Sequence, residues 1–476
     1  MDSLMRSLDA VVGPLDRFVA ESRAQARPVI RQEPLGALID ELGLERWVRE
    51  GGLGGEALTA FTERYLHHST ALHSPTYMAH QVSAPNLVGS MAGLLDGVTN
   101  NAMSIYEMGP ASSAIEFFMV NWMLEKVGWT PAPANPGMAV EGEPCGGGVL
   151  THGGSLANLT ALIAARNHAA PEAWDEGAPA DLALMAPAGA HYSVSRAAGI
   201  LGIGRKGVSE LEVDVRGAIV ADRLPAALAR LRDAGKRPFA LVANMCSTAV
   251  GIYDPLAEVA AFCREAGIWL HVDGAHGAGA LLSPRRRSLF EGVQLADSLV
   301  WDAHKMMQAP ILCAAVLVRD HRTLDRAFQQ EASYLFHDKD QPGVDFGRRS
   351  FECTKAGLGL RAYMALGALG EEAMGDYVDR QCDLALAAHD LISATPGFEC
   401  AVRPESCILC FRVEGDDALQ ISVRNAILAD GRFYLSSAMV NGRRWLRIVL
   451  LNPAIEIAHI QALVAEVGRK AECLRM

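Results

Sequence analysis

The feature that most constrains the fold is a regular alternation of short apolar runs with helical stretches through the middle of the chain. Strands that alternate with helices are joined by crossover connections, which make a mainly parallel sheet with helices on both faces. The sequence therefore predicts an α/β fold. We expect strands at 148–151, 182–186, 239–243, 269–273, 298–301 and 312–318, and helices at 110–128, 155–168, 193–201 and 256–266.

The two ends of the chain have other patterns. Residues 1–80 read as mostly helical, and from about 355 two long helices precede three strands and a final helix. The 476 residues are enough for two or three packing units. We predict a helical N-terminal segment (1–80), a large α/β domain (81–354) and a small α+β C-terminal domain (355–476).

Composition excludes several classes of protein. Half of the residues are hydrophobic and 21% are charged, which suits a large core and argues against disorder. The net charge of −12 gives no basic surface for nucleic acid or for anionic membranes. No apolar run approaches the length of a membrane span, and the N-terminus lacks a secretion signal. We therefore expect a soluble cytoplasmic protein that binds neither nucleic acid nor membranes.

The cysteines fit the same class. Ten cysteines in a chain of this length, mostly beside apolar neighbours, indicate reduced buried thiols rather than a disulfide framework. Cys407 and Cys410 form a CxxC pair, but they lie in an apolar, strand-like run. We interpret this pair as part of the core.

Two ionisable residues follow predicted strands. Asp273 ends a strand in the segment HVDGAH, and ligands of open α/β sheets bind beyond the carboxyl ends of strands. Its carboxylate could hold a cation or a protonated ring nitrogen, or it could cap the next turn. Lys305 lies among Trp301, Met306 and Met307. Apolar surroundings disfavour its charged form and free the amine as a nucleophile, although a lysine in such a segment taken alone more often reaches solvent.

Three further positions could bind a flat anionic ligand. Gly154 and Ser155 stand between a strand and a helix, where amide groups, a hydroxyl and the helix dipole attract an anion. His191 opens a helix and could stack on a ring, and Thr248 follows a strand. Each has an ordinary alternative, because tight turns use glycine and most lone histidines are structural.

Together these positions indicate pyridoxal 5'-phosphate. An anion cradle, a stacking histidine, a carboxylate for a pyridinium nitrogen and a lysine in apolar surroundings are what this cofactor requires. Lys305 would bond to the cofactor and Asp273 would keep the ring nitrogen protonated. A metal site of His271, Asp273 and His276 is the alternative, but only the first two share a strand face, so we predict no metal.

Three segments resemble one family of pyridoxal-phosphate enzymes. HVDGAH, DAHK and THGGSLANLTAL are similar to sequences of the group II decarboxylases, which act on glutamate, cysteine sulfinate and aromatic amino acids. The resemblance extends over about 60–470. NNAMSIYEMGP (100–110), ASYLF (332–336) and WLRIVLLNP (445–453) are most similar to the glutamate and cysteine sulfinate branch.

The resemblance implies a fold, an assembly and a set of site residues. It implies the fold type I architecture with a mainly parallel seven-stranded sheet. It also implies a homodimer with active sites at the subunit interface and the N-terminal segment wrapped around the partner. Lys305, His191 and Asp273 would be catalytic. The cofactor would be bound by Gly154, Ser155, His191, Thr248, Asp273, Ala275, His304 and Lys305, and the substrate by Arg447, Gln81, Ser83 and His276.

The sequence departs from that family in two places. A loop in the family carries a tyrosine thought to give a proton to the product, whereas 337–350 has no tyrosine here and Phe346 is its only aromatic residue. Either His191 or His276 supplies the proton, or the reaction ends differently. Gly274 and His276 also replace the usual alanine and aromatic residue, which bears on the substrate.

We expect an L-amino acid α-decarboxylase that releases CO₂ and a primary amine from aspartate, glutamate or cysteine sulfinate. The expectation of an acidic substrate depends on Arg447 and on the branch resemblance. The alternatives are an aromatic amino acid or 2,4-diaminobutyrate as substrate, decarboxylation-dependent oxidative deamination, and a pyridoxal-phosphate protein without activity.

Overall fold

The computed structural model describes residues 3–475 except 134–144, 329–331, 333–335 and 337–342. Contacts between residues divide the chain into two compact units. The first unit comprises Met1–Ala84, Leu384–Arg403 and Cys407–Met476, and the second comprises Pro85–Asp383 and Pro404–Ser406. The division after residue 84 lies close to the predicted boundary at 80, whereas 355–383 group here with the second unit. The three predicted domains stay a prediction.

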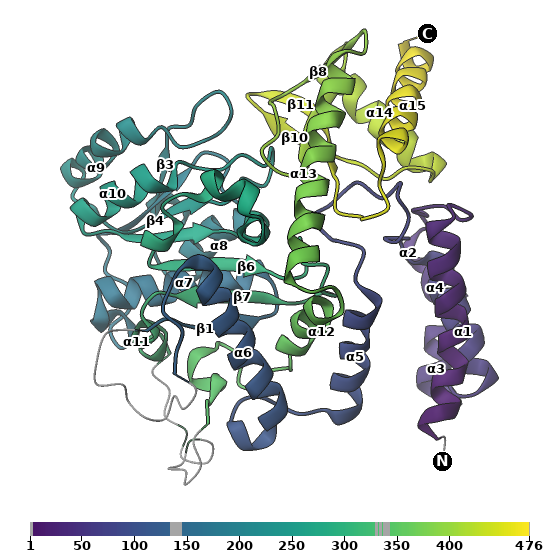
Figure 1. Cartoon of the computed structure of the whole chain (residues 1–476), viewed down its shortest axis with the longest axis horizontal. Coiled ribbons are helices and arrows are strands. Elements are labelled where there is room, and N and C mark those ends of the chain that lie inside the picture. The colour runs from purple at the N-terminus through teal and green to yellow at the C-terminus, as the bar shows by residue number, and fades with distance from the viewer. Residues whose placement is uncertain (1–2, 134–144, 329–331, 333–335, 337–342, 476) are drawn as a thin grey trace. The chain divides into compact units, whose positions relative to one another are not determined.

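A seven-stranded sheet forms the centre of the second unit, as predicted (Figure 1). Its strand order is β1-β7-β6-β5-β4-β2-β3. β7 runs antiparallel to both neighbours, and the pairs from β6 to β3 are all parallel. The strands are β1 (Gly147–Thr151), β2 (Leu182–Pro187), β3 (Val208–Leu211), β4 (Arg237–Asn244), β5 (Trp269–Asp273), β6 (Ser298–Asp302) and β7 (Ala314–Val318).

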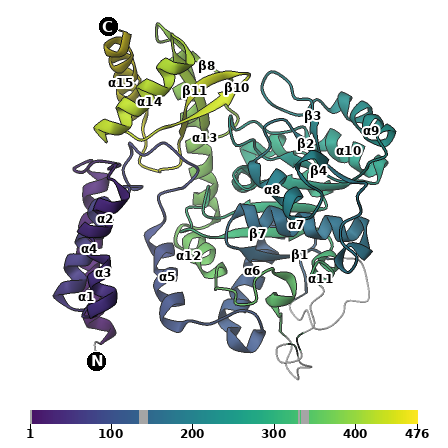
Figure 2. The same cartoon turned by 180° about the vertical axis from the view of Figure 1, so that it is seen from behind.

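Helices cover this sheet, which buries most of its strands completely (Figure 2). A strand covered on both faces needs apolar residues at every position, and this explains the continuous apolar runs of the sequence. Helix α7 contacts β1, β4, β5, β6 and β7. The helices are α5 (Leu87–Thr99), α6 (Pro110–Val127), α7 (Gly154–Ala169), α8 (Tyr192–Ile200), α9 (Leu224–Asp233), α10 (Leu256–Ala266), α11 (His321–Asp325) and α12 (Gly359–Leu369).

The strand directions bring five loops to one edge of the sheet. β1, β2, β4, β5 and β6 all point the same way, because β1 and β6 both run antiparallel to β7. The segments that follow their carboxyl ends begin at 152, 188, 245, 274 and 303. These segments hold most of the residues predicted to bind the cofactor, at the edge where such sheets bind ligands.

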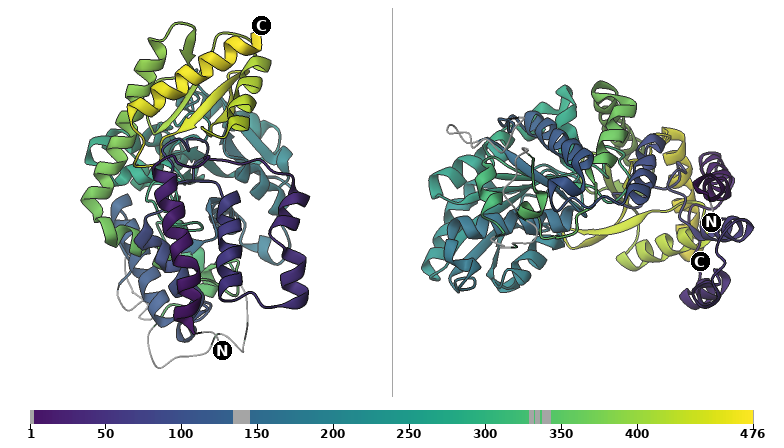
Figure 3. Two further views of the ribbon diagram at one scale, coloured as in Figure 1. Left: turned by 90° about the vertical axis from the view of Figure 1, so that its right-hand side faces the viewer. Right: turned by 90° about the horizontal axis from the view of Figure 1, so that it is seen from below.

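The first unit contains a four-stranded antiparallel sheet of order β10-β11-β9-β8. Helices α14 and α15 pack against each other and on this sheet (Figure 3). The elements are β8 (Phe398–Cys400), β9 (Ile408–Val413), α14 (Asp417–Asp430), β10 (Ser436–Val440), β11 (Arg443–Val449), α15 (Ile457–Arg475), and the N-terminal helices α1 (Leu4–Arg23), α2 (Leu35–Glu41), α3 (Leu44–Glu50) and α4 (Glu56–His68). Helix α13 (Glu371–Ser393) begins in the second unit and ends in the first.

An N-terminal strand-like segment is attached to this smaller sheet. Met78 N–H donates to Tyr434 O over 2.9 Å, and Met78 O accepts from Val449 N–H over 2.8 Å. These bonds fix the chain just before Gln81 and Ser83 beside the end of β11. Two segments that are far apart in the sequence therefore meet in the first unit.

Some elements differ from the predictions. The strand β3 and the helices α5 and α9 were not predicted. β3 is short, and Leu211 is its only buried residue. β10 begins at Ser436 instead of 433.

All ten cysteines are free, and Cys407 and Cys410 are buried, in agreement with the core interpretation. In the described part of the chain, no helix combines the length and apolar composition needed to cross a membrane.

Candidate active site

Asp273 ends β5 as a buried carboxylate held by two donors. Asn158 Nδ2 on α7 donates to its Oδ2 over 2.9 Å, and Ala275 N–H donates to its Oδ1 over 3.2 Å. The side chain has no ion pair with a lysine or arginine in the described part of the chain, although only 7% of the residue is exposed. A buried carboxylate without a cation favours a positively charged ligand.

Lys305 lies beyond the end of β6, next to a second buried carboxylate. Its Nζ is 3.4 Å from Asp302 Oδ2, and the Asp302 side chain is 1% exposed. His304 Nε2 is 3.5 Å from the same oxygen, and His304 Nδ1 lies 2.8 Å from Cys313 O. The sequence interpretation placed Lys305 in apolar surroundings. This was wrong at the amine, because Asp302 provides a negative charge there.

The loop after β1 passes close to this carboxylate. A Cβ at Gly154 would lie 2.8 Å from Asp302 Oδ2 and 3.3 Å from Ala275 Cβ, so only glycine fits. Gly153 before it has φ +101°, which favours glycine. The first amides bonded within α7 are those of Leu156 and Ala157, so the amides of Gly154 and Ser155 point out of the helix end. Such an end attracts a phosphate.

His191 stands before α8 and caps it. Its Nδ1 lies 2.8 Å from Ser193 Oγ and accepts from Ser193 N–H over 3.3 Å. Burial lowers the pKa of His191 below its ordinary value, and the charge of Lys305 lowers it further, while Asp273 and Asp302 raise it. The bonds to Ser193 therefore hold the His191 ring at the start of α8, in the segment that follows β2.

The remaining residues predicted around the cofactor lie in the same loops. Ala275 and His276 follow β5 and are buried, with 7% and 3% of each residue exposed. Thr248 is half-buried and follows β4. The structure therefore brings all eight predicted cofactor residues to one edge of the sheet in the second unit, together with His276.

Arg447, Gln81 and Ser83 are in the first unit. Arg447 lies on β11 and is 7% exposed; its Nη1 donates to Ala79 O over 3.3 Å and to Ser436 Oγ over 3.4 Å. Ser83 is 3% exposed. Gln81 Nε2 is buried and has no hydrogen-bond partner among the described residues. Of this segment, Ala79 contacts the Arg447 side chain, and Gln81 and Ser83 follow Ala79 by two and four residues.

The segment in which the family tyrosine is missing lies partly outside the described residues, as does ASYLF. Within the described part, Phe346 is 1% exposed and belongs to the core of the second unit. The Lys355 ammonium lies 5.7 Å from the centre of its ring. Phe346 is therefore a packing residue.

The residues at this edge of the sheet fit pyridoxal phosphate. Asp273 is a buried carboxylate without a cation, and a pyridinium nitrogen would provide one. Asp302 Oδ1 is buried with no hydrogen-bond partner among the described residues. The turn at Gly153 and Gly154 lets backbone amides approach an anion. The residues present match the ring nitrogen, the phosphate and the covalent attachment that this cofactor needs.

Two residues in contact with these groups were not named from the sequence. Asn158 donates to Asp273, and Asp302 pairs with Lys305. Asn158 is one helical turn beyond Gly153 and Gly154, and Asp302 is the last residue of β6. Both positions are therefore next to the loops in which site residues were predicted. Side-chain contacts between α7 and β5 are not visible in a single sequence, and this is why Asn158 was missed.

The metal interpretation fails on the hydrogen bonds of His271. Its Nδ1 lies 2.8 Å from Ser298 Oγ and its Nε2 lies 2.9 Å from Asn158 Oδ1, so both ring nitrogens have partners. Burial lowers the pKa of His271 to about 4. Across the described residues, no cluster of three or more His, Cys, Asp or Glu side chains is arranged for a metal ion.

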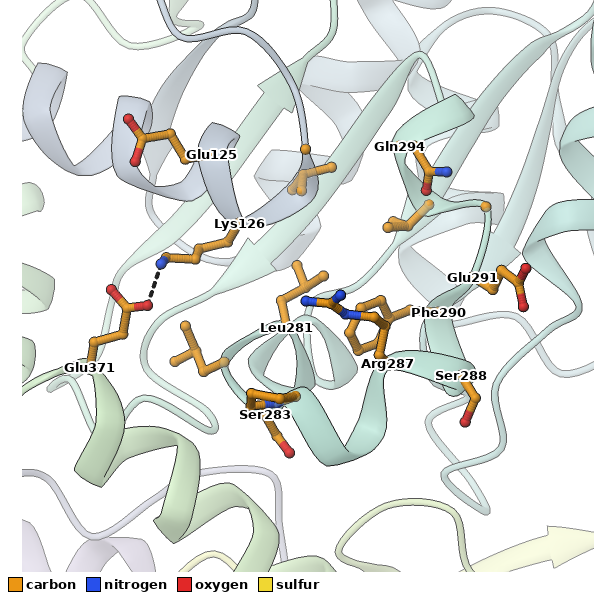
Figure 4. Close-up of a pocket in the computed structure, with 16 residues that line it drawn as sticks. Glu125, Lys126, Leu281, Ser283, Arg287, Ser288, Phe290, Glu291, Gln294 and Glu371 are labelled. Carbon is orange, nitrogen blue, oxygen red and sulfur yellow. Dashed lines mark hydrogen bonds and ion pairs between the residues drawn. The ribbon is translucent and has the colours of Figure 1, made fainter.

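A pocket in the second unit lies apart from the loops that hold the predicted site residues (Figure 4). It encloses about 690 Å³ between the end of α6 and residues 281–294. Lys126 and Glu371 form an ion pair at its wall, and none of the predicted site residues lines it. Because this pocket contains none of the predicted site residues, the site is assigned to the strand ends.

Comparison with known proteins agrees with this geometry. A family model, the pyridoxal-dependent decarboxylase conserved domain, matches residues 61–414. Acidic amino acid decarboxylase of Mus musculus is 30% identical over 402 residues, which are 83% of this chain and 70% of that protein. Cysteine sulfinic acid decarboxylase of Rattus norvegicus is 28% identical and covers 100% of this chain and 97% of its own length. L-2,4-diaminobutyrate decarboxylase of Acinetobacter baumannii is 27% identical and covers 90% and 86%.

Solved structures share the fold. Mouse CSAD in its apo form superposes with a TM-score of 0.87 at 24% identity and covers 98% of both chains. Oryza sativa TDC, solved with PLP and tryptamine, has a TM-score of 0.83 at 20% identity and covers 98% of this chain and 97% of its own. Because the family model spans most of the sequence, this chain belongs to the pyridoxal-dependent decarboxylase family and is a pyridoxal-phosphate-dependent amino acid carboxy-lyase.

Proposed function

We propose that this decarboxylase acts on a small acidic amino acid, aspartate, glutamate or cysteine sulfinate, and releases CO₂ and a primary amine. The observation that carries the proposal is the guanidinium of Arg447, a residue on β11 of which 7% is exposed. Guanidinium groups bind carboxylates through paired hydrogen bonds, and burial strengthens the charge interaction. The names of the mouse and rat relatives agree with this substrate class.

The neighbours of Arg447 favour an anion. Its Nη1 donates to two neutral oxygens, Ala79 O and Ser436 Oγ. Gln81 Nε2 offers a further buried donor. Nearby, burial lowers the pKa of His80, and the positive charge of Arg447 lowers it further. A site that disfavours a second positive charge suits an acidic substrate better than a basic one.

When bound, pyridoxal phosphate supplies a carbonyl carbon that bonds to amines and a ring that withdraws electrons from the α-carbon of the substrate. Lys305 Nζ would hold the cofactor covalently until the substrate amine replaces it. Asp273, ionised and held by Asn158 and Ala275, would keep the ring nitrogen protonated. Gly154, Ser155 and His304 would bind the phosphate.

Four further residues would orient the reacting groups. Ala275 would lie under the ring, His191 would stack on it and Thr248 would contact the ring hydroxyl side. Arg447 would orient the substrate so that the bond to its α-carboxylate is the one that breaks. With no tyrosine at 337–350, a histidine would give the proton to the α-carbon, and His191 and His276 are the candidates.

We also propose that the protein is a cytoplasmic homodimer. Helix α5 packs on α12 through Gly89 and Ala92, and its other face exposes six large apolar residues. A contiguous exposed apolar stripe on a helix marks a protein interface. Ten free cysteines suit a reducing compartment. The stripe comprises Leu87, Val88, Met91, Leu94, Leu95 and Val98, each 40–56% exposed.

An alternative substrate and an alternative reaction would use the same cofactor. The similarity to a diaminobutyrate decarboxylase favours 2,4-diaminobutyrate as a second candidate substrate. The sequence 337–350 without tyrosine favours a second reaction, in which CO₂ is lost, O₂ takes two electrons and becomes hydrogen peroxide, and water then releases ammonia and an aldehyde. Oxygen uptake distinguishes this reaction from simple decarboxylation.

The test is CO₂ release from each of the twenty amino acids, cysteine sulfinate and 2,4-diaminobutyrate, with oxygen uptake and the amine product followed together. We expect release from acidic substrates, one amine per CO₂ and no oxygen uptake. Arg447→Gln should raise KM for them by about 10- to 100-fold, from the loss of a charged hydrogen bond. Arg443→Gln is the matched control, because Arg443 is on the same strand but half-exposed and paired with Glu399. Release from aromatic substrates or diaminobutyrate alone would overturn the acidic assignment.

A further inference from the structure

A chain of hydrogen bonds runs behind the cofactor edge, from β6 through β5 and α7 to α8. It links Ser298, His271, Asn158, Ser193 and His191, with each step between 2.8 and 2.9 Å. Asn158 also donates to Asp273. Four of these members are buried, with at most 2% of each residue exposed, and His191 is half-buried.

The direction of every bond follows from groups that can act in one way only. An ionised Asp273 only accepts, so the amide nitrogen of Asn158 faces it and the amide oxygen faces His271. That oxygen only accepts, so His271 Nε2 carries a proton. The Trp269 indole only donates, and it donates to Ser298 Oγ over 2.8 Å. Ser298 is therefore able to give its proton to His271 Nδ1.

The same reasoning fixes the proton on His191. Ser193 Oγ accepts from Asn158 Nδ2, which leaves its hydroxyl proton free to be donated to His191 Nδ1. The backbone N–H of Ser193, which can only donate, points at the same nitrogen. Two donors directed at Nδ1 leave no place for a proton there. The ring proton is therefore on Nε2.

We propose that Asn158 and Ser193 are positioning residues that hold His191 neutral with its proton on Nε2 and hold Asp273 ionised. This inference rests on the proposed roles of His191 and Asp273. One amide group, on Asn158, serves both residues, so the charge of the ring-nitrogen partner and the tautomer of the stacking histidine are set together. His191 can then donate from Nε2, and it adds no positive charge beside the ring.

The test uses cofactor-loaded protein labelled with ¹⁵N in histidine, with the His191 signals identified by their loss in His191→Gln. In the wild type, Nδ1 should show the shift of an unprotonated ring nitrogen and Nε2 that of a protonated one. Ser193→Ala removes one of the two donors at Nδ1. It should make protonation of His191 about two- to tenfold more favourable in a pH titration, and Ser193→Thr should restore the wild-type behaviour. The charged groups acting on His191 in that titration are Asp273, Lys305, Asp302 and Arg196.

Ser195→Ala is the matched control, since Ser195 is on the same helix and its hydroxyl donates to Tyr192 O instead. Asn158→Ala should weaken cofactor binding about tenfold or more in a spectroscopic titration, because Asp273 loses a donor. A wild-type spectrum with a proton on Nδ1 overturns the inference, even if a Ser193 variant fails to fold. So does a pH titration of His191 in Ser193→Ala that is identical to the wild type. Neither result depends on which amino acid is decarboxylated.

Discussion

Lys355 and Glu116 form an ion pair with both side chains 0% exposed, and breaking it should strongly destabilise the second unit. Glu116 also accepts a hydrogen bond from Leu150 N–H on β1 over 2.9 Å. In Lys355→Met the volume is nearly kept, but the Glu116 carboxylate stays buried without its cation. Removal of one partner of such a pair costs about 3–5 kcal/mol.

The expected shift in melting temperature follows from the size of the unit. About 300 residues belong to it, and unfolding gains about 2.1 cal/mol/K of entropy per residue, or about 0.6 kcal/mol/K in total. A loss of 3–5 kcal/mol then lowers Tm by about 5–8 °C. Calorimetry at a fixed protein and cofactor concentration measures it, because bound ligand raises Tm by mass action.

The pH dependence tests the cause. Burial raises the pKa of Glu116 and Lys355 opposes this, so loss of Lys355 raises the pKa further. The folded variant then binds a proton more tightly than the unfolded chain, and its free energy of unfolding falls as the pH rises through the folded pKa. The Tm deficit should therefore be smaller at about pH 5.5 than at about pH 8.

Two variants control this experiment. Glu116→Gln combined with Lys355→Met removes both charges and keeps an acceptor for Leu150, so it should recover most of the lost stability. Arg223→Met breaks a pair whose side chains are 65% and 60% exposed and should cost less than about 1 kcal/mol. A Lys355→Met protein within about 2 °C of the wild type, or with the same deficit at both pH values, refutes the reasoning.

Three further variants test the site and the assembly. Lys305→Ala should abolish covalent attachment, so borohydride reduction should leave no cofactor on the chain; label on another lysine would contradict the assignment. Gly154→Ala puts a Cβ 2.8 Å from Asp302 Oδ2, and such overpacking costs about 1–3 kcal/mol, so the cofactor Kd should rise about 5- to 100-fold in a spectroscopic titration. Leu95→Glu should convert the dimer to monomers in sedimentation, whereas Val215→Glu, at an 80% exposed turn position, should not; an unchanged dimer in Leu95→Glu would exclude the α5 face.

The sequence predicted the central sheet well because burial on both faces demands long apolar runs. β5 has the predicted bounds of 269–273, and Asp273 stands at its end. β3 was missed because an edge strand needs few apolar residues, and it carries Ser209 and Glu210. The position of β3 is set by its parallel pairing with β2, which no local pattern shows.

For the site, the sequence predicted the residues at the strand ends but not the side chains that form hydrogen bonds or ion pairs with them. Each loop after a strand is a local feature, so Gly154, His191 and Lys305 could be found one at a time. The role of Asn158 depends on a contact with a residue 115 positions away. Lys355 and Glu116 are 239 positions apart in the sequence. Taken alone, each looks like an ordinary charged residue on the surface. Partners far apart in the sequence are the part that one sequence cannot reveal.

The missing tyrosine has a physical consequence for where the product proton originates. Phe346, the aromatic residue that 337–350 does contain, is 1% exposed, packs in the core and has no ionisable proton to give. On the proposed roles, a proton on His191 Nε2 lies at the cofactor edge and is kept there by Ser193. A neutral histidine that gave this proton to the α-carbon would be left as an imidazolate, so His191 can supply the proton only after Nδ1 has itself gained one, and the two donors at Nδ1 disfavour that form. The charge and the tautomer of His191 are therefore the features on which the choice between amine and aldehyde depends, and a proton donor other than neutral His191 is needed for the amine.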